Sequence, residues 1–157
     1  MMIEKVKAFF RERGMEDKVM EFEVSSATVA LAAQALNTQE ERIAKTLSFD
    51  VFGRTVLIVC AGDTKIDNSK FKAFFATKAK MLAFEEAEPR IGHAVGGVCP
   101  FAVNEGVETY LDESLKRFPT VFPACGSSNS AIELTPEELF PLSQAKAWID
   151  VCKLREA

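Results

Sequence analysis

The chain opens with a helical repeat of apolar positions and continues into short segments with strand-like patterns. Ile3, Val6 and Phe10 recur at helical spacing, which predicts an amphipathic helix ending near Gly14. Further helices are expected after a Ser25–Ser26 cap, over 67–75 and from Thr135, with a shorter turn at 38–41. Strands are expected over 19–24, 43–51, 55–60, 80–84, 107–111, 121–125 and 131–134, and residues 94–103 read as strand, tight loop, strand. Residues 145–153 fit either a helix or a strand.

These expected elements favour one fold class. Strands outnumber helices and do not alternate with them regularly, and the chain contains no repeat, linker or low-complexity tract. We therefore expect a mixed α/β fold with a largely antiparallel or barrel-like sheet, rather than a doubly wound parallel sheet. The length of 157 residues suits one domain covering 1–157.

Composition and charge narrow the functional classes. Hydrophobic residues make up 48% and charged residues 27%, an ordinary globular balance. The N-terminus lacks a cationic segment followed by an apolar one, and the longest apolar run, 56–61, is too short to cross a bilayer. We expect a cytoplasmic protein with no membrane partner.

Cysteine and histidine usage limits the chemistry. The four cysteines form no Cys-x-x-Cys pair, and His93 is the single histidine, so we expect no metal site and no cofactor. A histidine-dependent nucleophilic mechanism would have to use His93.

Positive charge gathers in one segment of an acidic chain. The net charge of −4 argues against nonspecific binding to nucleic acid, and no DNA partner is expected. Phenylalanines nevertheless alternate with five lysines between 65 and 80. This segment is either a docking surface for a polyanion or a solvated helix face with a buried edge. Its lysines are Lys65, Lys70, Lys72, Lys78 and Lys80.

Three segments carry candidate chemistry. Lys45 stands inside the apolar pattern 43–51, where a lysine either points outward or faces a cleft and meets an anion. Two glycines and a proline interrupt the apolar stretch at 96–100, which is either a tight turn or a cradle of backbone N–H groups for an oxyanion. Residues 126–130 offer hydroxyls and an amide but lack the lysine and spacing of a Walker phosphate loop.

Together these segments resemble the YbaK/ProX family of aminoacyl-tRNA editing domains, which are related to the insertion domain of bacterial prolyl-tRNA synthetase. The resemblance covers about 22–139 and rests on the order and spacing of several landmarks. These are 43–47, 92–93 leading into 96–101, 110–115 and 126–139. The resemblance implies a mixed sheet closed into a barrel with flanking helices, and a cleft for the aminoacyl end of tRNA.

The resemblance also implies an activity and a set of site residues. The expected function is that of a trans-editing deacylase, which hydrolyses the ester between a mischarged small amino acid and tRNA, with tRNA(Pro) as the expected tRNA. Lys45 matches the family's lysine for the 3′ end, and Gly96 and Pro100 match its Gly-x-x-x-Pro loop. The residues expected to bind substrate are Phe22, Thr46, Gly97, Val98, Cys99, Gly126, Ser127 and Asn129. Those expected to bind tRNA are Lys65, Lys70, Lys72 and Lys78.

One position departs from the family pattern. The cysteine-removing branch commonly has an aspartate where this chain has Ala131, which weakens the assignment to cysteine. The expected amino acid is therefore one of the small class of cysteine, alanine, serine and threonine. Prolyl-tRNA synthetase is an expected partner beside mischarged tRNA. Two alternatives stay open: a non-catalytic module that binds tRNA or a synthetase, and a cysteine hydrolase that uses Cys99 and His93.

Overall fold

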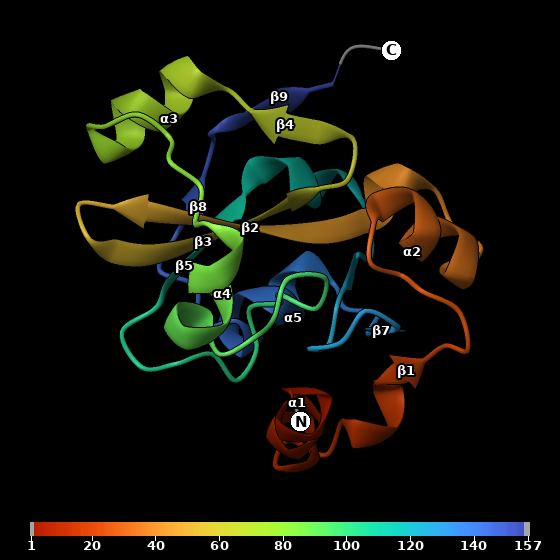
Figure 1. The fold of residues 1–157 in the computed structure, drawn as a ribbon. Coiled ribbons are helices and arrows are strands. Elements are labelled where there is room, and N and C mark those ends of the chain that lie inside the picture. Colours follow the sequence, from red (N-terminus) through yellow and green to blue (C-terminus); the bar gives the residue numbers. More distant parts are fainter. Residues whose placement is uncertain (1, 156–157) are drawn as a thin grey trace.

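The computed structural model describes residues 2–155 and has a five-stranded sheet at its centre (Figure 1). The strand order is β6 (Phe122–Pro123), β2 (Ile43–Val51), β3 (Arg54–Ala61), β5 (Glu108–Asp112) and β8 (Trp148–Ile149). Two smaller sheets pair β1 (Met20–Glu21) with β7 (Ser130–Ala131) and β4 (Thr64–Ile66) with β9 (Cys152–Leu154).

Helices cover both faces of this sheet. The α-helices are α1 (Met2–Arg11), α2 (Val29–Leu36), α3 (Asn68–Phe75), α4 (Phe84–Ile91) and α5 (Pro136–Leu142). Short 3-10 helices occupy Glu16–Lys18, Glu40–Arg42 and Glu113–Arg117. Figure 1 shows α3, β4 and β9 on one side of the sheet and α1, α4 and α5 on the other. The expected mixed α/β class is confirmed.

The hairpin β2–β3 organises the two cores. Its turn, Phe52–Gly53, has positive φ at both residues, 53° and 83°, as a two-residue hairpin turn requires. Since side chains alternate along a strand, even-numbered residues of β3 face α3 and odd-numbered ones face α1 and α4. β3 is buried on both faces, which explains its continuous apolar sequence.

The central sheet has more parallel than antiparallel strand pairs, whereas a largely antiparallel sheet was expected. Within the central sheet only β2–β3 is antiparallel, whereas β2–β6, β3–β5 and β5–β8 are parallel. A parallel pair needs a long crossover connection, and α3 and α4 supply it between β3 and β5. The sequence showed the tight turn of the hairpin but not which distant strands would meet.

Several expected elements are corrected by the structure. Residues 94–103 form turns and bends rather than strand, loop, strand. Within 80–84 only Met81 makes a bridge, to Phe49, before α4 begins. Thr28, not the Ser25–Ser26 pair, caps α2 by accepting a hydrogen bond from the Leu31 N–H. The ambiguous segment 145–153 contains β8 and the start of β9, because each has a partner strand to pair with.

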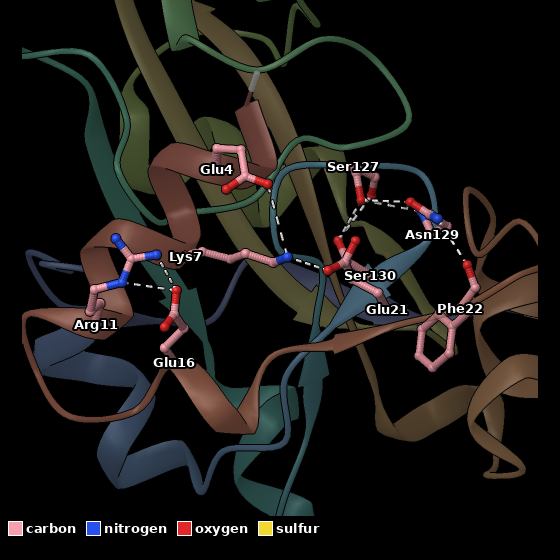
Figure 2. Close-up of polar contacts among 9 residues, drawn as sticks. All are labelled: Glu4, Lys7, Arg11, Glu16, Glu21, Phe22, Ser127, Asn129 and Ser130. Carbon is pink, nitrogen blue, oxygen red and sulfur yellow. Dashed lines mark hydrogen bonds and ion pairs between the residues drawn. The ribbon is translucent and has the colours of Figure 1, made fainter.

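The N-terminal segment is tied to the loop after β6 through β1. In Figure 2, Lys7 of α1 pairs with Glu21 of β1, and Arg11 pairs with Glu16. β1 in turn pairs with β7. Val6 and Phe10 lie on one face of α1 and pack in the core. The helix therefore supports the loop after β6 from the core side.

Asp112 at the end of β5 holds two chain segments together. Its buried carboxylate accepts hydrogen bonds from the N–H groups of Ser114 and Val151, both at 2.9 Å. These bonds orient the start of a 3-10 helix and the connection between β8 and β9.

We predict that Asp112→Ala lowers the free energy of unfolding by about 2–3 kcal/mol, because two backbone donors lose a charged acceptor and one of them is buried. Urea denaturation followed by circular dichroism measures the change. Asp150→Ala is the control: its exposed ion pair with Lys70 contributes about 0–1 kcal/mol. Equal, small losses of stability in both variants would contradict the proposed role of the Asp112 carboxylate.

Candidate active site

A cleft of about 400 Å³ lies beside the outer edge of β2. Its walls come from the start of α2, from β2, from the start of α4, from the loop at 95–98, and from β6 and β7. Alanine, valine and other apolar side chains dominate this lining. The volume falls within the usual range for small-molecule sites, about 300–1,000 Å³.

The cleft exists because the outer edge of β2 is covered only at its ends. β6 pairs with the edge at Ile43 and Ala44. At the other end, the Leu82 N–H donates to the Ser48 carbonyl at 3.1 Å and the Asp50 N–H donates to the Lys80 carbonyl at 2.8 Å. Residues 45–47 lie between these two covered stretches and line the cleft.

Thr46 presents polar groups to this opening. In an antiparallel pair, the N–H and C=O of one residue point to the same side, and the direction alternates from residue to residue. Ser48 and Asp50 bond outward, away from β3, so the backbone N–H and C=O of Thr46 point outward too. The Thr46 hydroxyl is also buried and, within residues 2–155, has no hydrogen-bond partner. Thr46 therefore combines three groups that can bind a ligand.

Lys45 lines the cleft, but its ammonium lies toward β4. The residue pairs with Cys60 across the hairpin, and its Nζ donates a hydrogen bond to the Thr64 carbonyl. A hydrogen bond from Cys152 and then the nearby Lys45 charge lower the pKa of the buried Cys60 thiol. The lysine therefore borders a cleft, as one of the two possibilities required, but its ammonium bonds a carbonyl oxygen and not an anion.

Three loops far apart in sequence meet at Gly96 and Gly97. Gly96 has a positive φ of 97°, and a Cβ placed there would lie 3.8–3.9 Å from the Cβ atoms of Ser128 and Ala27. A Cβ on Gly97 would lie 2.8 Å from Gly126 C and Ser127 N. The close packing of these backbones requires a glycine at 97.

Hydrogen bonds join two of these loops, the segment before α2 and the loop at 126–130. Figure 2 shows the Asn129 amide donating to the Phe22 carbonyl and the Ser127 hydroxyl bonded to Asn129 and Ser130. The Ser26 N–H donates to the Ser128 carbonyl at 2.6 Å. The loop at 126–130 thus braces the wall of the cleft, and Ser130 and Ala131 line it.

The expected site residues divide into two groups. Lys45, Thr46, Gly96 and Val98 line the cleft. The remaining ones stand behind the lining, where they pack or bond against the loops. These are Phe22, Gly97, Cys99, Pro100, Gly126, Ser127 and Asn129.

The structure adds lining residues that the sequence did not single out. Ser26 and Thr28 come from the entrance of α2, and the Ser26 hydroxyl is buried without a partner within residues 2–155. Met81 and Phe84 come from the entrance of α4. The high exposure of these two apolar side chains marks them, but exposure is not readable from sequence.

Cys99 and His93 lie in the core, away from the cleft lining. The His93 Nε2 lies 2.7 Å from the Phe101 carbonyl, so it carries the proton and donates. The same nitrogen is the one 3.5 Å from the Cys99 sulfur, and it therefore has no lone pair to take the thiol proton. Burial raises the pKa of Cys99 to about 12. This geometry argues against the cysteine-hydrolase alternative.

The basic segment is only partly available to a ligand. Lys65, Lys72 and Lys78 are exposed, on β4, on α3 and just after α3. Lys70 is engaged: its ammonium bonds Asp150 at 2.9 Å and the Cys152 carbonyl at 3.1 Å. Lys70 therefore has a structural contact, and its expected tRNA-binding role stays a prediction.

Among residues 2–155, no three His, Cys, Asp or Glu side chains gather in a way that could hold a metal ion. Over the same part of the chain, no helix is long and apolar enough to span a membrane.

The fold and the cleft define a small mixed α/β domain that encloses an apolar pocket at an open strand edge. The chain belongs to the aminoacyl-tRNA editing domain family, whose model matches residues 23–142. Over 97% of both chains it resembles, with a TM-score of 0.86 and 29% identity, the crystal structure of a proposed trans-editing enzyme for prolyl tRNA synthetase.

Two relatives by sequence agree with this membership. The chain is 54% identical to the uncharacterized protein YwhH of Bacillus subtilis over 98% of each protein. It is 31% identical to the proline–tRNA ligase of Geobacillus thermodenitrificans over 74% of this chain and 21% of the ligase. The similarity to the ligase thus concerns one part of a much longer protein.

We predict that Gly97→Ala both destabilises the protein, by about 1–3 kcal/mol, and weakens substrate binding, because its Cβ would force apart two backbones that form the cleft wall. Urea denaturation measures the first effect, and the affinity for an aminoacyl-tRNA measures the second. Gly106→Ala is the control, since its Cβ would meet nothing within 4 Å and only its positive φ adds strain. A wild-type affinity in Gly97→Ala would refute the role of this contact.

The buried histidine predicts a pH dependence of stability. Burial lowers the pKa of His93 below its usual value near 6.5. Below about pH 6.5 the unfolded chain therefore binds a proton that the folded chain does not, and stability falls by up to about 1.4 kcal/mol per pH unit. Denaturation at pH 7.5 and 5.5 should show this loss in the wild type and a smaller one in His93→Gln. The same loss in both proteins would show that other groups cause it.

Proposed function

We propose that this protein is a trans-editing deacylase, which hydrolyses the ester between a mischarged small amino acid and tRNA. The observation that carries the proposal is the apolar cleft at the open edge of β2, bordered by Lys45 and Thr46, in a chain of the editing-domain family. The names of the proline–tRNA ligase and of the prolyl trans-editing structure favour tRNA(Pro) as the substrate and prolyl-tRNA synthetase as a partner.

The mostly apolar lining of the cleft supports a small, uncharged amino acid. Synthetases reject a slightly smaller side chain by only about 1–3 kcal/mol per methylene, so a second, smaller site can remove the error. Ala131 brings no charge to the cleft, where the cysteine-removing branch commonly has an aspartate. The expected substrates are therefore tRNAs carrying alanine, serine, threonine or cysteine, with no carboxylate at 131 to favour cysteine.

The proposed reaction needs no protein nucleophile. Water attacks the ester carbonyl carbon, the bond to the ribose oxygen breaks, and that oxygen receives a proton, which yields free amino acid and uncharged tRNA. The outward N–H and the hydroxyl of Thr46 are suited to donate to the developing oxyanion. Lys45 adds positive charge beside this edge, and the loop at 96–98 holds the ester in position.

Incubation of the purified protein with a panel of mischarged tRNAs tests the proposal. Release of a small amino acid at a rate proportional to enzyme concentration is expected, fastest from tRNA(Pro). Binding of these tRNAs without release would instead establish the alternative, a non-catalytic tRNA-binding module.

We predict that Lys45→Ala reduces deacylation at least about 100-fold, the scale associated with losing one preorganised electrostatic group. The single-turnover rate at saturating substrate measures it, with circular dichroism to confirm the fold. Lys45→Met, which keeps the aliphatic stem, should lose as much. Cys99→Ser is the matched control and should keep the wild-type rate, since its thiol is buried and protonated. Full activity in Lys45→Ala would exclude a catalytic role for this lysine.

The exposed lysines predict a salt-dependent contribution to tRNA binding. In the triple variant Lys65→Glu, Lys72→Glu, Lys78→Glu, the KM should rise and the slope of log affinity against log salt should flatten by about 0.7–0.9 for each phosphate that is no longer neutralised. The rate at saturation should change little, because these lysines bind the ground and transition states alike. Lys70 is left unchanged because it bonds Asp150. An unaltered KM and slope would leave these lysines as a solvated surface.

A further inference from the structure

The mouth of the cleft carries three large apolar side chains that the fold does not cover. Met81, Phe84 and Val95 are 58%, 76% and 53% exposed, and all three line the cleft. Phe84 has the highest exposure of any large apolar side chain among the described residues.

The position of Phe84 at the start of α4 explains its exposure. Helical spacing places Phe84, Ala87 and Ile91 on one face of α4, and the last two are buried against Leu57 of the sheet. Phe84 itself, in the first turn of the helix, lines the cleft and is exposed, so its ring borders the opening and is not packed in the core. An aromatic ring at a cleft mouth offers a flat face for stacking.

Positive charge precedes this ring in the chain. Lys78 and Lys80 precede Met81 and are exposed, and within residues 2–155 neither forms an ion pair. Of the two acids that follow, Glu86 is engaged by the Ala83 N–H and by Arg90, while Glu85 is exposed. Aromatic rings beside a cationic strip are the typical features of a surface that binds single-stranded nucleic acid.

We propose that Phe84, flanked by Met81 and Val95, is the stacking platform for the terminal adenine of the tRNA 3′ end. The proposal rests on the deacylase function above. If the aminoacyl group enters the cleft, the ribose that carries it stands at the mouth, and the base attached to that ribose meets the rim. Lys78 and Lys80 then face the phosphates of the single-stranded end. Phe84 positions the substrate and takes no part in the chemical step.

The test uses an uncharged RNA hairpin with a single-stranded CCA end, in which 2-aminopurine replaces the terminal adenine. Stacking quenches the fluorescence of this base. Titration with the wild type should quench the probe. In Phe84→Ala the quench should disappear and binding should weaken about five- to tenfold, the lower part of the range for loss of one base–aromatic stack.

Two further variants separate stacking from general hydrophobic contact. Phe84→Leu keeps apolar area without a ring, so it should recover part of the affinity but not the quench. Phe52→Ala is the matched control: Phe52 is 70% exposed at the tip of the β2–β3 hairpin and does not line the cleft. It should behave as the wild type. Absence of quenching by the wild type, or equal quenching by Phe84→Ala, would overturn the platform.

Deacylation assays distinguish this proposal from the proposed function. If the wild type removes a small amino acid from tRNA and Phe84→Ala has an unchanged KM and quench, the platform is wrong and the deacylase stands. If the probe is quenched through Phe84 but no mischarged tRNA is hydrolysed, the platform stands and the deacylase is wrong. A higher KM in Phe84→Ala with an unchanged rate at saturation supports both.

Discussion

The outer edge of β2 is hydrogen-bonded at both ends and open for three residues in the middle, and the candidate site depends on that interruption. β6 covers one end and residues 80–82 cover the other. A long open edge would invite pairing with another chain, whereas three residues enclosed by helices and loops are too few to do so. The backbone groups of Thr46 thus stay available to a ligand inside an otherwise apolar cleft.

The loops around this edge keep the cleft in shape. Gly97 packs on the backbone of Gly126 and Ser127, while Asn129 bonds Phe22. Most of the family landmarks in these loops therefore act behind the lining and support the residues that form it. This division explains how a site of few polar groups can be positioned by a much larger set of small and polar residues.

The most local features of the fold could be predicted from the sequence. The helix of Ile3, Val6 and Phe10, the β2–β3 hairpin and the Thr135 capping box all appear as expected, because each depends on contacts within a few residues. The prediction for residues 94–103 was wrong because the apolar side chains buried there, such as Cys99 and Phe101, belong to a loop, and an apolar run by itself resembles a strand pattern. The parallel strand pairs depended on segments distant in sequence. The cap of α2 depended on which of several neighbouring polar side chains took that position.

For the site, the residue types and their spacings could be read along the chain: a lysine in an apolar strand, a Gly-x-x-x-Pro loop, a small polar loop and one histidine. These were enough to identify the family. Three features became visible only in the folded chain: Thr46 faces an open strand edge, Cys99 and His93 are enclosed in the core, and Phe84 borders the cleft with an exposed ring. Side-chain exposure and the partners of backbone groups arise from contacts between segments that can be more than 100 residues apart, and no local pattern encodes them.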